Sequence, residues 1–181
     1  MRTRLTLLPA AVALAVLTGC AAEMVTDTAA LAPHTDTHPS EQDEAWMRTI
    51  HEGNLAEVQA GRLAQGKGTT REIKSIGKML LDDHTKLDTK VTKAATQLGV
   101  ELPTSPTAEQ RAEVVRLRDA TGKDFDLDFA AGMTKAHTKA LAATKKEVSS
   151  GSSPAVVALA KSTVPVLQQH LSALRKARSA E

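Results

Sequence analysis

The stretch "IKSIGKMLLDDHTKLDTKVTKAATQL" (residues 73–98) contains a series of mostly apolar residues that recur in alternating steps of four and three. The members of the series are Ile73, Gly77, Leu80, His84, Leu87, Val91, Ala94 and Leu98. Such steps place side chains along one face of an α-helix. The pattern therefore predicts a long helix that packs into a helical bundle, with a histidine on its inward face.

Three further segments predict helices of the same kind. Residues 153–177 form one of them, with Ser153 as the expected N-cap and Pro154 in the first turn. Its inward face is expected to contain Val156, Ala160, Thr163, Leu167, His170, Leu174 and Ala177. In the helix expected at residues 124–149, the inward face contains Ala130, Met133, His137, Leu141, Thr144 and Val148. In the helix expected at residues 43–65, it contains Trp46, Ile50, Glu57, Gly61 and Ala64. No long segment alternates with the period of two that a strand would show. We therefore predict an all-α, antiparallel four-helix bundle.

The links between these segments differ in length. The short links "QGKGT" (65–69) and "SSGSSP" (149–154) predict two antiparallel hairpins. The connection 99–123 is long, and its residues Thr107 and Gln110 have the capping-box spacing that predicts a short extra helix. This connection either crosses the length of the bundle, as in ferritin-like folds, or bridges one end, and the sequence leaves both alternatives open.

The amino terminus predicts export and lipid attachment. Residues 1–19 combine a basic start with an apolar run too short to span a membrane as a mature helix, as in a signal peptide. The residues "LTGC" (17–20) resemble the lipobox of bacterial lipoproteins, in which the cysteine carries the lipid. We therefore expect Cys20 to anchor the protein to a bacterial membrane, either the outer membrane or the outer face of the cell membrane.

The composition separates a tether from a single domain. Residues 20–43 are rich in Ala, Thr, Asp and Pro without apolar periodicity and predict a flexible tether, whereas residues 44–179 are long enough for one bundle domain. Cys20 is the only cysteine, so a disulfide cannot form within the chain. We expect the domain to be stabilised by its core and to be monomeric.

Charge and motif content exclude several function classes. The chain has 23 Lys and Arg against 21 Asp and Glu, and its three aromatic residues are Trp46, Phe125 and Phe129, so it lacks the basic, ring-rich surface of nucleic-acid binders. It has no Gly-x-Ser-x-Gly elbow and no P-loop. These features favour a protein that is not an enzyme, and no nucleic-acid partner is expected.

Several short motifs together resemble one protein family. They are "NLAEVQAGRLA" (54–64), "MLLDDH" (79–84), "LGVELP" (98–103), "FDLDF" (125–129), His137 and "VPVLQQHL" (164–171). In these motifs the chain resembles the bacterial family called domain of unknown function 4142, over nearly all of residues 44–175. The resemblance implies an exported protein with a ferritin-like four-helix fold, and it implies no activity. It departs at Phe129, where most relatives are expected to have tyrosine, and His51 is expected in only some of them.

Each predicted helix contributes one candidate metal ligand: Glu57, His84, His137 and His170. At about 1.5 Å per residue, the three histidines lie roughly 20–24 Å from the starts of their helices, so all of them fall near the middle of the bundle. Buried polar groups need partners, and a metal ion could serve all four. In the alternative interpretation, each histidine only forms a hydrogen bond to a neighbouring side chain or carbonyl.

The residue types limit which metal would fit. A di-iron centre requires Glu-x-x-His motifs, but Leu81, Thr134 and Leu167 stand three residues before the histidines. Three histidines and one carboxylate suit a single zinc, nickel, copper or iron ion. Asp83 is about 100° around the helix from His84, and we expect it at the surface rather than in the site.

Two functional hypotheses follow from the sequence. The first is a membrane-anchored helical bundle without enzymatic activity that binds an envelope partner or protects the envelope. The sequence favours this hypothesis, because it requires only the predicted packing of the helices. The second is a ferritin-like metal-binding protein with one inward ligand from each helix.

Overall fold

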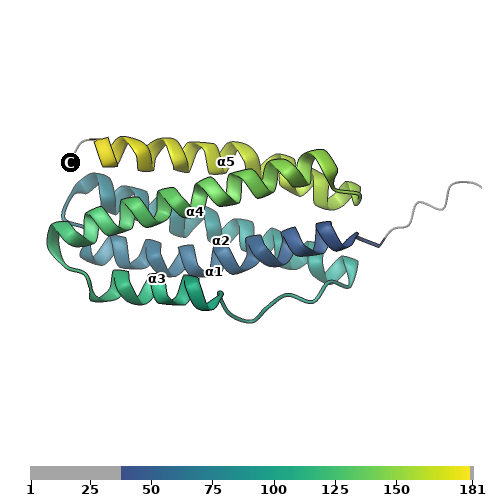
Figure 1. Ribbon diagram of the computed structural model, residues 1–181, viewed down its shortest axis with the longest axis horizontal. Coiled ribbons are helices and arrows are strands. Elements are labelled where there is room, and N and C mark those ends of the chain that lie inside the picture. Colours follow the sequence, from purple (N-terminus) through teal and green to yellow (C-terminus); the bar gives the residue numbers. More distant parts are fainter. Residues whose placement is uncertain (1–37, 180–181) are drawn as a thin grey trace, which may run out of the picture. The chain divides into compact units, whose positions relative to one another are not determined.

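The computed structural model describes residues 38–179 of the chain (Figure 1). The expected signal peptide, Cys20 and nearly all of the expected tether lie outside the described residues. All regular structure within 38–179 is helical, which confirms the all-α class. The helices are α1 (Glu41–Lys67), α2 (Arg71–Leu98), α3 (Ala108–Asp119), α4 (Gly122–Ser150) and α5 (Pro154–Ser179).

Four long helices form the bundle, and α3 is the predicted extra helix. Helices α1 and α2 form one antiparallel hairpin and α4 and α5 form the other, with α1 against α4 and α2 against α5 (Figure 1). The connection between α2 and α4 runs along the length of the bundle and includes α3, which packs on α1 and α4 (Figure 1). The crossing, ferritin-like alternative is therefore the one that the structure adopts.

Helix α1 begins at Glu41, two residues before the predicted start of the first helix at residue 43. Ser40 and Asp43 form a capping box, in which Ser40 Oγ accepts a hydrogen bond from Asp43 N at 3.2 Å and Asp43 Oδ2 accepts one from Ser40 N at 2.7 Å. These bonds satisfy free backbone groups at the helix end, so α1 begins at Glu41. Asp43 also accepts hydrogen bonds from the backbone N–H groups of Ser152 and Ser153, which fixes the α4–α5 turn to α1.

Two glycines allow α1 and α2 to pack closely. A Cβ atom at Gly61 would lie 2.7 Å from the carbonyl oxygen of Gly77, and a Cβ atom at Gly77 would lie 2.6 Å from the Cβ atom of Ala64. Neither position has room for a side chain at the present helix separation. Both glycines belong to the predicted inward faces, and they set the distance between the two helices of the first hairpin.

The core is divided into two apolar clusters, one toward each end of the bundle. The first contains Leu80, Phe125, Phe129, Met133 and Leu174 with smaller neighbours. The second is built around Trp46, Met47, Leu87, Val91 and Val156. On each long helix, the segments that enter the two clusters are separated by the position of a predicted ligand, so a layer of polar side chains lies between the clusters.

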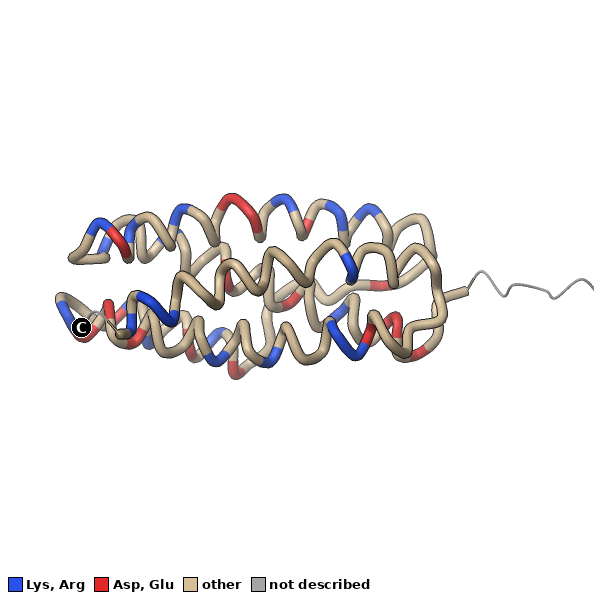
Figure 2. The backbone as a smooth tube through the Cα atoms, turned by 90° about the horizontal axis from the view of Figure 1, so that it is seen from above, with Lys and Arg blue, Asp and Glu red and all other residues tan. Residues whose placement is uncertain are grey.

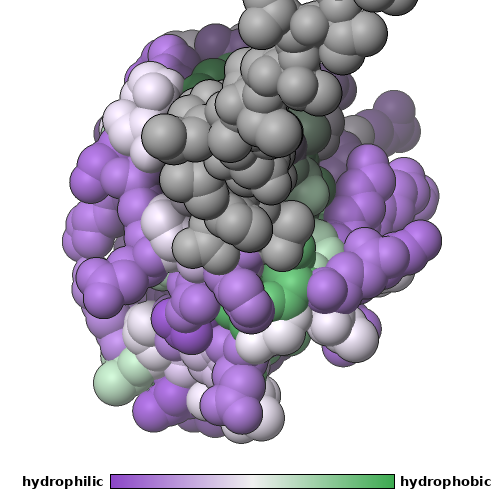
Figure 3. Space-filling model, turned by 90° about the vertical axis from the view of Figure 1, so that its right-hand side faces the viewer, coloured by the Kyte–Doolittle hydropathy of each residue, from purple (hydrophilic) through white to green (hydrophobic). Residues whose placement is uncertain are grey.

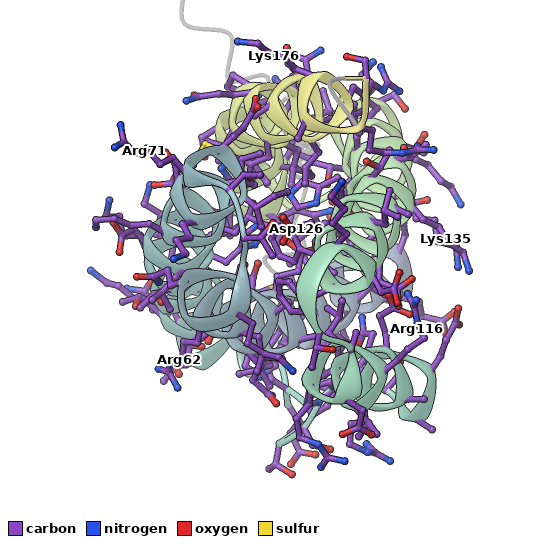
Figure 4. All side chains as sticks on the ribbon, turned by 90° about the vertical axis from the view of Figure 1, so that its left-hand side faces the viewer. Arg62, Arg71, Arg116, Asp126, Lys135 and Lys176 are labelled. Carbon is purple, nitrogen blue, oxygen red and sulfur yellow. The ribbon has the colours of Figure 1, made fainter. Side chains whose placement is uncertain are left out.

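Charged residues of both signs are distributed along the helices (Figure 2). At the end of the bundle where α1 begins, the surface is mostly hydrophilic and includes a small hydrophobic area (Figure 3). Arg62, Arg71 and Lys176 point outward, whereas Asp126 points inward (Figure 4). None of the helices described has the uninterrupted apolar length that a bilayer crossing requires.

Candidate metal centre

The four predicted ligands converge in the polar layer between the two apolar clusters. His84 Nε2 lies 3.3 Å from His137 Nε2, and His137 Nε2 lies 3.1 Å from His170 Nδ1. Glu57 Oε2 lies 2.6 Å from His84 Nε2 and 3.5 Å from His137 Nε2. All four residues are buried. The mid-bundle position expected from the residue spacing is therefore observed, and each long helix contributes one side chain.

The outward nitrogen of each histidine faces a hydrogen-bond acceptor. His84 Nδ1 is 2.9 Å from Asn54 Oδ1, and His137 Nδ1 is 3.0 Å from the carbonyl oxygen of Met133. His170 Nε2 is 3.1 Å from Asp83 Oδ2. Because these partners accept hydrogen bonds, each outward nitrogen has to bear the proton and donate it.

This arrangement determines the chemistry of the inward nitrogens. In a neutral imidazole, a proton on one ring nitrogen leaves a lone pair on the other. The inward atoms His84 Nε2, His137 Nε2 and His170 Nδ1 are thus acceptors when the rings are neutral, and they lie close together. Acceptors cannot form hydrogen bonds with one another, so this group of atoms is suited to a shared cation.

The orientation of Asn54 decides the tautomer of His84. Asn54 Nδ2 lies 3.4 Å from Asp88 Oδ1, so the amide donates toward Asp88 and presents its oxygen to His84. Asp88 in turn contacts His51 Nδ1 at 2.7 Å, and His51 Nε2 contacts the carbonyl oxygen of Pro103 at 2.9 Å. This chain of contacts links the site to the connection between α2 and α3.

Glu57 is the fourth member of the site and has an unsatisfied oxygen. Although Glu57 Oε2 is close to His84 Nε2, their geometry is not that of a hydrogen bond, and Oε2 has no hydrogen-bond partner among the described residues. Burial raises the pKa of the Glu57 carboxyl, but the charges that His137 and His84 can bear outweigh this effect and lower it to about 2. In its ionised form the side chain is a buried anion that needs a positive partner, which is either a protonated histidine or a metal ion.

Burial also keeps two of the histidines neutral at neutral pH. Burial lowers the pKa of His137, although Glu57 opposes the shift. Burial and the neighbouring His84 lower the pKa of His170 to about 4, against the raising effect of Asp83. Neutral imidazole is the form that binds metal, so both rings are ready to act as ligands without losing a proton.

Asp83 has a partly exposed position, with 33% of its side chain exposed, and it pairs with Lys86 at the surface as expected. The sequence did not indicate that the same carboxylate also contacts His170 across the interface between α2 and α5. Asp83 is therefore the carboxylate that orients a candidate ligand, a role that acceptors next to metal-binding histidines commonly have.

Sequence reasoning did not include Asn54 and Asp88 in the site. Asn54 lies three residues before Glu57, a spacing that places both side chains on the same face of α1. That spacing could have identified Asn54 as a neighbour of the site from the sequence alone. The role of Asp88 follows from the pairing of α1 with α2, which brings it next to Asn54 and His51.

Comparison with protein-family models identifies the family. The model described as "Domain of unknown function (DUF4142)" matches residues 28–177, which include every helix but the last two residues of α5. The chain belongs to the DUF4142 family. Comparison with curated proteins gives no match. The resemblance inferred from the short motifs is thus confirmed, and the family name assigns no activity.

A solved structure supports the fold of this DUF4142 domain. The crystal structure of a DUF305 fragment from Deinococcus radiodurans aligns with a TM-score of 0.70 at 14% sequence identity. The alignment covers 80% of this chain and 99% of that chain. At this identity, the similarity concerns the fold alone, and the chemistry of the centre has to be argued from its own residues.

Proposed function

We propose that this DUF4142 protein binds a single transition-metal ion between Glu57, His84, His137 and His170. The observation that supports the proposal best is the direction of the histidine protons. All three outward nitrogens face acceptors, so three inward lone pairs and an unsatisfied carboxylate oxygen meet in one buried layer. Three hydrogen-bonded histidines that served only for packing would not need to direct their lone pairs toward the same point.

The distances between the candidate ligand atoms suit one small ion. Zinc–nitrogen bonds are about 2.0–2.1 Å long, so ligands at the corners of a tetrahedron lie about 3.3–3.4 Å apart. Three of the separations are similar: 3.3 Å for His84–His137, 3.1 Å for His137–His170 and 3.5 Å for His137–Glu57. The contact of 2.6 Å between Glu57 and His84 is shorter and would lengthen on coordination.

The ligand types favour zinc, nickel, copper or iron. Imidazole suits all four metals, and one carboxylate is compatible with each of them. The centre differs from a di-iron site, which needs several bridging carboxylates. We therefore propose mononuclear metal binding as the biochemical activity, with no reaction assigned.

We further propose that the protein acts outside the cytoplasm and is anchored to a membrane by a lipid on Cys20. The support is the "LTGC" sequence after the apolar run at residues 5–17. An anchored metal-binding bundle combines the two hypotheses drawn from the sequence, because the envelope module then has a defined ligand. Membrane partitioning of a Cys20→Ser variant tests the anchor.

Thermal melts test the metal proposal directly. If Zn²⁺, Ni²⁺, Cu²⁺ or Fe²⁺ binds the folded state, it stabilises that state by roughly 2.7 kcal/mol when the free ion is a hundredfold above its dissociation constant. The melting temperature of the wild type should rise with metal, and the His84→Ala variant should lose that rise. Elemental analysis of the purified protein should find about one ion per chain if the ion is retained.

Thr163→Ala is the matched control for His84→Ala. Thr163 is also a buried polar residue on an inward helix face, but its hydroxyl donates a hydrogen bond to the carbonyl oxygen of Leu159 within α5 and contacts none of the candidate ligands. Its replacement should lower stability and keep the metal-dependent rise. If no ion changes the melt of the wild type, the histidines serve packing only, and the envelope-binding hypothesis without metal is the one that stands.

A further inference from the structure

A cleft of about 530 Å³ lies between α1, α3 and α4 and reaches the candidate metal centre. Its inner wall includes Glu57, His84 and Asn54, and its outer rim includes Lys135 and Arg116. Figure 4 shows Lys135 and Arg116 on the same side of the bundle, where α3 lies beside α4. Ligand sites of small molecules commonly have such a volume and combine an apolar wall with a few polar groups.

The cleft reaches the centre on the side of Glu57 and His84. Glu57 and His84 line it and retain 5% and 2% exposure, whereas His137 and His170 have 0% and are not part of its wall. A molecule in the cleft would therefore meet the ion at the side of Glu57. Zinc sites can expand to five ligands, and iron sites keep coordination positions open, so the centre can accept one more donor.

Gly53 leaves the inner part of the cleft open. It lies in the middle of α1, where glycine destabilises a helix by roughly 0.5–1 kcal/mol relative to alanine. A Cβ atom at Gly53 would meet no atom within 4 Å, in contrast to Gly61. Packing therefore does not require glycine at this position. The missing side chain instead widens the cleft one helical turn before Glu57.

The opposite wall is apolar and made of small side chains. Helix α4 contributes Ala136, Ala140 and Ala143 to this wall. Trp46 of α1 lines the far end of the cleft. The ring of Trp46 is held in place because its Nε1 donates a hydrogen bond to Thr144 Oγ1 at 3.2 Å. A flexible hydrocarbon chain could lie along this wall without an unsatisfied polar group.

Charge favours an anionic donor. A divalent ion, the Glu57 carboxylate and three neutral imidazoles together have a charge of plus one in a buried layer, and uncompensated buried charge is unfavourable. Asp83 contacts the outer nitrogen of His170, away from the ion, and it also pairs with Lys86 at 3.5 Å, so its charge is already partly compensated. At the rim, Lys135 and Lys139 share Glu109 at 3.6 and 3.7 Å. Arg116 in turn pairs with Glu113 and Asp128, so the charges of these rim groups balance and the attraction for an anion comes from the ion itself.

We propose that the cleft binds a small organic carboxylate with an apolar chain. The carboxylate coordinates the ion beside Glu57, and the chain lies between Gly53 of α1 and the alanines of α4. This inference rests on the proposed metal-binding function and specifies the ligand class of the same centre.

Calorimetric titration of octanoate into the Zn²⁺-loaded protein tests the inference. Octanoate should bind at least tenfold more tightly than acetate, which lacks the chain, and than 1-octanol, which lacks the charge. Metal-free protein should bind octanoate at least tenfold more weakly. The Gly53→Leu variant fills the cleft without replacing a ligand, so it should lose at least tenfold in octanoate affinity and keep its zinc-dependent melt.

Gly66→Leu is the matched control, because Gly66 lies on the same helix and does not line the cleft, and a Cβ atom there would also meet no atom within 4 Å. It should bind octanoate like the wild type. Ala136→Leu narrows the cleft from α4 and should reproduce the loss if Gly53→Leu is poorly folded. Zinc binding without octanoate binding, or unchanged octanoate affinity in both cleft variants, would overturn this inference alone. If none of Zn²⁺, Ni²⁺, Cu²⁺ and Fe²⁺ binds the protein, the proposed function is overturned together with this inference.

Discussion

At the scale of single residues, the centre depends on groups that orient the ligands as well as on the ligands. The contact of 3.1 Å from Asp83 Oδ2 to His170 Nε2 fixes the ring so that Nδ1 faces the other histidines. Replacing Asp83 with Asn removes the charge while keeping the shape of the side chain. We expect metal affinity to fall about 10–100-fold, the usual effect of losing such a partner, in a metal titration followed by calorimetry.

Asp82→Asn is the control for Asp83→Asn. Asp82 is the preceding residue and pairs with Lys78 at 2.6 Å on the exposed side of α2. This variant should bind metal like the wild type. Equal affinities of the two variants would show that Asp83 does not orient His170.

A second residue-scale prediction concerns Glu147, which is buried at the end of the bundle where α1 begins. Gln42 Nε2 donates a hydrogen bond to Glu147 Oε2 at 3.4 Å, and the Asp43 carboxylate lies beside the same side chain. Burial and Asp43 raise the pKa of Glu147 from 4.5 to about 7. The folded state therefore holds a proton that the unfolded chain releases at a lower pH, and the free energy of unfolding falls as the pH rises between these values.

Replacing Glu147 with Gln should remove this loss of stability. The loss in the wild type is at most about 3–4 kcal/mol, at about 1.4 kcal/mol per pH unit between the two pKa values. We expect the stability of the variant relative to the wild type to increase between pH 4.5 and 7, as measured by denaturant unfolding across that range. The two proteins share every other ionisable group, so the contributions of those groups largely cancel in the difference. A constant difference across the pH range would contradict the assignment.

At the scale of the helices, glycines of α1 have opposite roles. Gly61 faces the backbone of α2, so Gly61→Ala should destabilise the domain by roughly 1–3 kcal/mol through overpacking. Gly53 faces open space, so Gly53→Ala should stabilise it by roughly 0.5–1 kcal/mol through helix propensity. Chemical denaturation of the two variants measures both values. Destabilisation of similar size in both would mean that Gly53 has a packing role.

The helices also show what the sequence could reveal about the site. The steps of four and three in residues 73–98 place His84 on the inward face, because the direction of a side chain around its own helix follows from spacing alone. The identity of the neighbouring helix does not follow from spacing, so Asp83 could be located 100° from His84 but not against His170. The path of the connection at residues 99–123 was open for the same reason, since a connection of this length can either cross the bundle or bridge one end. The cleft depends on how α3 lies against α1 and α4, which no periodicity encodes.

At the scale of the whole molecule, the bundle combines two apolar clusters with one polar layer between them. The clusters on both sides exclude water from the histidines, so an ion in the layer would be bound by strong, weakly screened interactions. The long connection adds α3 over one side of α1 and α4, where the cleft reaches the layer. The fold thus provides both a buried centre and a cleft that leads toward it.

The whole-molecule prediction concerns the anchor at Cys20. The chain leaves 20 residues between Cys20 and the first residue of α1, Glu41, so attachment of a lipid would not require any change in the bundle. We expect the wild type to sediment with membranes and to show the added mass of a lipid, and we expect Cys20→Ser to lose both properties.

The matched control Ala22→Ser should behave like the wild type, because it changes a residue of the same segment and leaves the cysteine. The metal-dependent melt of Cys20→Ser should equal that of the wild type, since the centre and the anchor are separate parts of the chain. Membrane sedimentation of the Cys20→Ser variant at the wild-type level would refute the lipid anchor.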